Sequence, residues 1–142
     1  MFFQAGKLQK FTFLFFVGGF IYCIMEIIFR GYSHISMLIA GGICFVLIGG
    51  LNDLFKRDIS LLSQMLVSVV IITSVELITG LIVNVWMHLD VWDYSYQRYN
   101  FMGQICLLFC NMWFILSFPA IILDDYIKYW FMGGKKPHYR FL

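Results

Sequence analysis

Charge is scarce in this sequence. Asp, Glu, Lys and Arg together make up 13% of the 142 residues, whereas 61% are hydrophobic and 20% are aromatic. A globular domain in water carries about twice that share of charge. The composition therefore excludes a soluble globular protein and predicts a chain that lies in the lipid bilayer.

Two kinds of motif are also missing. The four cysteines lie in apolar stretches and form no CxxC pair, so neither a disulfide framework nor a cysteine metal motif is expected. No G-x-x-x-x-G-K-[ST] phosphate-binding loop occurs, so any use of ATP requires a separate ATPase subunit.

Four long stretches of the sequence carry almost no charge. About 20 apolar residues are enough to cross a hydrocarbon core of about 30 Å. We expect transmembrane helices at about 11–29, 35–51, 61–87 and 101–123, followed by a basic C-terminal tail at 128–142. These helices and their short connections use the whole chain, so residues 1–142 are expected to form a single membrane domain. The predicted fold is an all-α integral membrane protein with a four-transmembrane-helix bundle.

The basic residues are divided unevenly between the two sides of these helices. Arg30 and Arg98 fall on one side, and the other side carries Lys7, Lys10, Lys56, Arg57, Lys128, Lys135, Lys136 and Arg140. Since Lys and Arg are enriched in cytoplasmic segments, both termini are expected to be cytoplasmic.

Glu76 is the only charged residue between Ile59 and Met87. A carboxylate at membrane depth costs at least ~2.5 kcal/mol, so such residues usually serve a pathway, a partner or a ligand. Neutral amides can hold helices together without that cost. We therefore interpret Glu76 as a functional residue rather than as a helix-packing residue.

Polar residues form stripes on three of the expected helices, each directed to the outer side. At 100° per residue, Glu76 and Asn84 share one face of the third helix, and His88 continues that face outward. The first helix carries polar residues at four-residue steps, and the fourth carries two that are seven apart. These stripes predict an outward-open polar cavity that binds a small solute or cation through Glu76, Glu26, Asn84, His88, Gln104, Asn111, Tyr22 and Arg30.

A structural interpretation of some of these residues stays open. Buried amides also link transmembrane helices through hydrogen bonds worth ~0.6–2 kcal/mol, and this role is favoured for Asn84, Gln104 and Asn111 taken alone. Glu26 either binds ligand or pairs with Arg30 one helical turn away.

The outer segment 88–100 is rich in charged and aromatic residues. An aromatic belt at the level of the lipid headgroups explains its Trp and Tyr residues but not its charges. We expect a lid that either orders the loop or contacts the substrate, formed by Asp90, Trp92, Asp93, Tyr94 and Arg98. His34 and His88 are possible metal ligands, but ordinary interfacial residues are favoured, and the sequence identifies no cofactor.

Several motifs occur in a characteristic order. The sequence contains ELITG at 76–80, VWDYS at 91–95 and GQIC at 103–106, preceded by GGFIYCIME at 18–26 and RGYSHISM at 30–37. From about residue 12 to 118 this order resembles the putative ABC-transporter type IV family, also called CmpB-like, of small bacterial integral membrane proteins. The resemblance implies a multi-pass protein of the bacterial cytoplasmic (inner) membrane, but it supplies no substrate.

Two classes of function are compatible with these observations. The first is a transport component that works as a homodimer or with a partner membrane subunit, and with a separate ATPase where ATP is used, since four helices are few for a complete carrier. The alternative is a non-transporting accessory or ligand-binding membrane protein that stabilises or regulates a larger complex. An enzyme is not expected, because Glu76 and His88 lie about 18 Å apart along a helix. The bilayer is the expected surrounding, and no nucleic-acid partner is expected.

Overall fold

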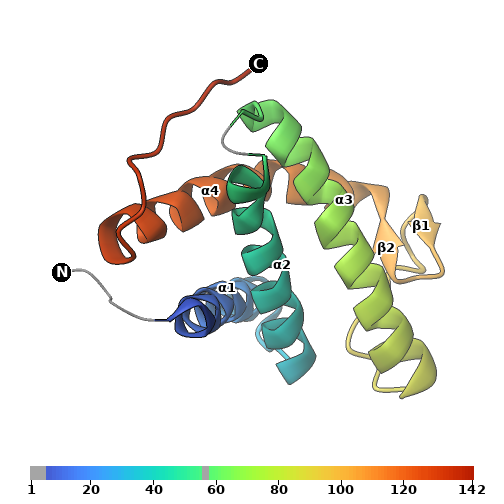
Figure 1. Ribbon diagram of the computed structural model, residues 1–142. Coiled ribbons are helices and arrows are strands. Elements are labelled where there is room, and N and C mark those ends of the chain that lie inside the picture. The colour runs from blue at the N-terminus through green and yellow to red at the C-terminus, as the bar shows by residue number, and fades with distance from the viewer. Residues whose placement is uncertain (1–5, 56–57) are drawn as a thin grey trace.

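The computed structural model describes residues 6–55 and 58–142 (Figure 1). Its α-helices are α1 (Lys7–Arg30), α2 (Ile35–Leu54), α3 (Leu61–Gly80) and α4 (Leu107–Phe131). The last turns before the outer loop (residues 88–99) form a π-helix, η1 (Leu81–Trp86). A small hairpin of β1 (Asn100–Phe101) and β2 (Ile105–Cys106) precedes α4. With α3 and η1 taken together, the described residues form four helices that are long and apolar enough to cross a membrane.

This arrangement confirms the expected helical fold with four potential membrane spans. The cytoplasmic location of both termini stays a prediction. Lys56 and Arg57, which contribute to that prediction, lie outside the described residues.

The fourth helix does not occupy the expected range 101–123. Residues 100–106 form an antiparallel hairpin in which Asn100 pairs with Cys106, and Gly103 takes a left-handed conformation with φ 71° in its turn. Helix α4 therefore starts at Leu107, and it continues to Phe131. The expectation was wrong at the far end because it stopped the helix at the first charges. Asp124 and Lys128 are helical and pair with each other, and Lys128 also donates to a carbonyl of α2.

The helices α1 and α4 each pack against α2, and α3 packs against α4 and α2. Figure 1 shows α2 and α3 running from top to bottom, with α4 crossing behind them. Glycines allow the backbones of α1 and α2 to approach closely: a Cβ atom at Gly41 would lie 2.6 Å from Cβ of Tyr22, and one at Gly18 would collide with Phe45.

The C-terminal segment returns to the start of α3 (Figure 1). The amide of Leu61 donates to the carbonyl of Arg140 over 2.7 Å, and the amide of Leu62 donates to the carbonyl of Phe141 over 3.1 Å. These bonds satisfy amides that have no partner within the first turn of the helix. The tail therefore acts as a backbone cap for α3.

Candidate functional site

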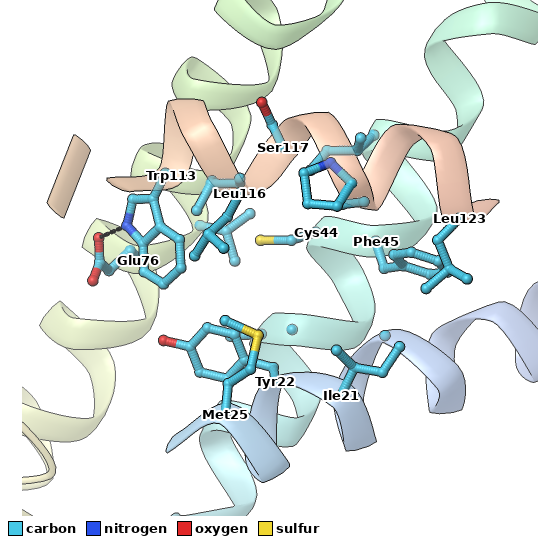
Figure 2. Close-up of a pocket in the computed structure, with 18 residues that line it drawn as sticks. Ile21, Tyr22, Met25, Cys44, Phe45, Glu76, Trp113, Leu116, Ser117 and Leu123 are labelled. Atoms are coloured by element: carbon cyan, nitrogen blue, oxygen red, sulfur yellow. Dashed lines mark hydrogen bonds between the residues drawn. The ribbon is translucent and has the colours of Figure 1, made fainter. Parts of the chain in front are cut away.

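A cavity of about 270 Å³ lies between the four helices. Its walls are mainly aliphatic and aromatic side chains, and its polar side chains are those of Glu76, Tyr22, Cys44 and Ser117. Figure 2 shows α1 on one side of this cavity and α4 on the other, with Glu76, Tyr22 and Trp113 together at one end. A charged residue thus lies at the end of an otherwise apolar space.

Glu76 is held by two hydrogen bonds from different elements. The hydroxyl of Tyr94 donates to Oε1 over 3.0 Å, and the indole Nε1 of Trp113 donates to Oε2 over 3.1 Å. The residue is only 7% exposed. Within the part of the chain that the structure describes, no basic side chain forms an ion pair with Glu76. A buried carboxyl group without a counter-charge is unusual, because a buried charge normally requires one.

Asn84 and Gln104 hold the outer loop in place. The Asn84 side-chain nitrogen donates to Gln104 Oε1 over 2.8 Å, and Asn84 Oδ1 accepts from the Val91 amide over 2.7 Å. The indole of Trp92 is buried and donates to the Gln104 carbonyl over 2.9 Å. These amides therefore bond to each other and to the loop, and neither lines the cavity.

The π-helix η1 explains where the polar stripe ends. Asn84 lies within η1 and is buried, whereas His88 follows the helix, has φ 54° and is exposed. The expectation that His88 extends the helical face of Glu76 was wrong, because the helix ends at Trp86. A π-helical segment in a membrane span often marks a functional region, since its wider turn interrupts the regular side-chain spacing.

The expected lid residues separate into two groups. Trp92 is buried and Tyr94 is half-buried, and the Tyr94 ring stacks on Phe109 of α4 with 4.7 Å between centroids. Burial, together with the negative charge of Glu76, raises the pKa of the Tyr94 hydroxyl, so this group stays a donor. The charged members Asp90, Asp93 and Arg98 are exposed.

Glu26 and Arg30 form an ion pair with 2.8 Å between Oε2 and Nε. Arg30 also donates to the carbonyl of Val91 over 3.1 Å, which ties the C-terminal end of α1 to the loop. Neither residue lines the cavity, whereas Tyr22 of the same stripe does. The alternative interpretation of Glu26, pairing with Arg30, is the contact that the structure contains.

The other predicted residues lie apart from the cavity. Asn111 is exposed and lines a second pocket together with Arg98. His34 caps α2, with its Nδ1 accepting from the Ser36 amide over 3.2 Å. Among residues 6–55 and 58–142, no group of three His, Cys, Asp or Glu side chains is placed to hold a metal ion.

Residues 11–133 match the family described as putative ABC-transporter type IV. The chain belongs to this family. No curated protein and no solved structure matches it. The family is of the transporter type, and the described residues form four helices that can span a membrane. This ABC-transporter type IV member is therefore a multi-pass membrane protein. A family of this type is not an enzyme class.

A second polar cluster of this ABC-transporter type IV chain was not predicted. It joins α2 to the last turns of α4: Lys128 Nζ lies 2.7 Å from Asp124 Oδ2 and donates to the Gly49 carbonyl over 2.8 Å, and Asn52 donates to Asp125 over 2.7 Å. The sequence signal was the four-residue spacing of Asp124 and Lys128, which permits an ion pair on a helix. The cluster lies outside the cavity lining and anchors α4 to α2.

Proposed function

We propose that this chain is the membrane-embedded component of a transport system of the bacterial cytoplasmic membrane. Its ligand, a small solute or cation, binds in the cavity between α1 and α4 beside Glu76. The family supports the transport role, and the buried carboxyl group of Glu76 supports the position of the site.

Glu76 is the observation on which this proposal depends. It is a buried acidic residue in a membrane span, it lines the cavity, and it lacks a basic partner among the described residues. Ionisable residues in membrane spans mark substrate and ion pathways more often than packing contacts. The site differs from the predicted outward-open polar cavity, because Asn84 and Gln104 bond to each other instead of facing a cavity.

Partner subunits form part of the proposal. Four helices are few for a complete carrier, so the chain works as a homo-oligomer or with another membrane subunit. Since the sequence has no phosphate-binding loop, a separate ATPase supplies energy if ATP drives the process.

Native mass spectrometry of the gently solubilised protein tests this proposal. The wild-type spectrum is expected to show an oligomer or partner subunit together with a retained small molecule. Glu76→Gln is expected to lose the small molecule and keep the assembly. Glu26→Gln is the matched control, because it makes the same change in a residue that does not line the cavity. Retention of the molecule by Glu76→Gln would contradict the proposed site.

The alternative function is a non-transporting accessory protein. It is favoured by the amides of Asn84 and Gln104, which bond to each other and, through Asn84, to the outer loop, as in a purely structural element. In that case, Glu76→Gln would disperse the assembly instead of releasing a ligand.

A further inference from the structure

The proposed function leaves the chemistry of the ligand open, and the following inference rests on that function. We propose that the cavity binds a lipophilic cation, a molecule with one positive charge and an apolar body, and that this molecule enters from the bilayer between α1 and α4.

The charge of the ligand follows from the surroundings of Glu76. Each of its two carboxyl oxygens accepts one hydrogen bond, from Tyr94 and from Trp113, and each retains a lone pair for a further contact. The described residues supply no basic partner, so a ligand cation would provide the missing counter-charge. The rings of Tyr22 and Trp113, 5.7 Å apart at the same end of the cavity, favour a cation over an anion.

The apolar body follows from the cavity walls. Away from Glu76, the space is lined by side chains such as Ile21, Phe45 and Leu123 (Figure 2). A hydrophilic solute would lose its hydration there without gaining hydrogen bonds, which disfavours its binding. The volume of about 270 Å³ is near the lower end of ligand pockets, which suits a compact molecule.

The two ends of α1 are tied to other parts of the chain. At the outer end, Arg30 donates to the carbonyl of Val91 over 3.1 Å. At the inner end, Lys10 Nζ donates to the carbonyl of Met132 over 3.4 Å, and Leu14 packs in one cluster with Ile127 of α4. These contacts tie α1 to α4 at its N-terminal end and to the outer loop at its C-terminal end.

The middle of the same interface is open. Ile21 of α1 and Leu123 of α4 both line the cavity, and each is 37% exposed. Exposed apolar surface in a membrane span faces lipid wherever no partner subunit covers it. Ile21 and Leu123 therefore mark a lateral mouth, through which a molecule dissolved in the bilayer reaches the cavity.

The test uses the purified full chain in lipid nanodiscs and radiolabelled benzyltrimethylammonium, a compact cation with an apolar body, as the probe, with empty nanodiscs subtracted. Saturable binding is expected for the wild type. Glu76→Gln is expected to weaken binding about tenfold or more, since it removes one partner of a buried charge pair. Neopentylbenzene, the neutral carbon isostere of the probe, is expected to compete poorly.

Two matched variants test the lateral mouth. Ile21→Trp places a bulky ring where Ile21 lines the cavity, and it is expected to slow association of the probe about tenfold or more. Ile24→Trp makes the same change at a residue that is 56% exposed and does not line the cavity, and it should bind like the wild type.

The remaining outcomes separate this inference from the proposed function. If the neutral analogue binds as well as the cation, or if an acyl lipid fills the cavity in native spectra, the inference is wrong. If the probe fails to bind while a different molecule is retained in a Glu76-dependent way, the ligand class is wrong and the proposed function stands. If Ile21→Trp and Ile24→Trp behave alike, entry from the bilayer is excluded.

Discussion

The hydroxyl of Tyr94 donates a 3.0 Å hydrogen bond to Oε1 of Glu76, which joins the outer loop to the charged residue of α3. The ring of Tyr94 also stacks on Phe109 of α4, with 15° between the ring planes. Tyr94 of the outer loop therefore contacts both α3 and α4, the helices that place Glu76 and Trp113 at one end of the cavity. This contact makes the outer loop part of the support for Glu76.

Replacement of Tyr94 by phenylalanine separates its two contacts. Tyr94→Phe keeps the stacking ring and removes the donor to Glu76, so the free energy of unfolding should fall by about 1–3 kcal/mol. Thermal unfolding of the purified protein in detergent measures this loss. Tyr96→Phe is the control, because Tyr96 is 75% exposed. Equal melting temperatures for the two variants would show that the hydrogen bond adds no stability.

Asn84 is expected to control the order of the loop. Asn84→Ala leaves the Val91 amide and Gln104 Oε1 without their partner, which should cost about 2–4 kcal/mol because both groups are buried. Hydrogen exchange of residues 91–95 should accelerate. Asn111→Ala, at an exposed position, should leave that exchange unchanged. If both variants exchange alike, Asn84 does not order the loop.

The sequence predicted the spans well where composition alone decides them. A long uncharged run can satisfy its backbone in lipid only as a helix, so α1, α2 and α3 lie close to their expected ranges. The start of α4 was not predictable from composition. Residues 100–106 are as uncharged as a helix interior, and the turn at Gly103 depends on a φ of 71° that apolar periodicity does not reveal.

The candidate site was predicted in part. The structure places Glu76 and Tyr22 on the cavity, as helical spacing indicated for residues of α3 and α1. The spacing did not reveal that Trp113 and Tyr94 would bond to Glu76, because both contacts join elements far apart in the sequence. The spacing also did not reveal η1. The expected position of His88 depended on the regular angle between successive side chains of an α-helix, and a π-helical turn changes that angle.

Asp93 provides a prediction about pH. Its exposed carboxylate accepts hydrogen bonds from the amide and hydroxyl of Ser95, and these bonds lower the pKa of Asp93 below its ordinary value. Because folding lowers this pKa, the contact is fully present at a pH above the ordinary pKa of about 4. It is lost as the pH falls through the pKa of the folded state. Hydrogen exchange of the Ser95 amide, corrected for its intrinsic pH dependence, should show protection lost only at acidic pH.

Two variants of Asp93 distinguish charge from geometry. Asp93→Asn retains an acceptor oxygen and should keep partial protection of the Ser95 amide, without the acidic transition. Asp93→Ala should lose the protection at every pH. An acidic transition that persists in Asp93→Ala would assign the pH dependence to another group.

Adjacent glycines of α2 give a matched test of the contact between α2 and α4. A Cβ atom at Gly49 would collide with the carboxylate of Asp124, whereas one at Gly50 would meet no atom within 4 Å. Gly49→Ala should therefore separate Asp124 from Lys128 and lower the free energy of unfolding by about 1–3 kcal/mol or more. Gly50→Ala should raise it by roughly 0.5–1 kcal/mol, because alanine favours the helix. Thermal unfolding of both variants in the same detergent shows whether each substitution lowers or raises the free energy of unfolding. A stabilising Gly49→Ala would mean that α4 does not cross α2 at Gly49.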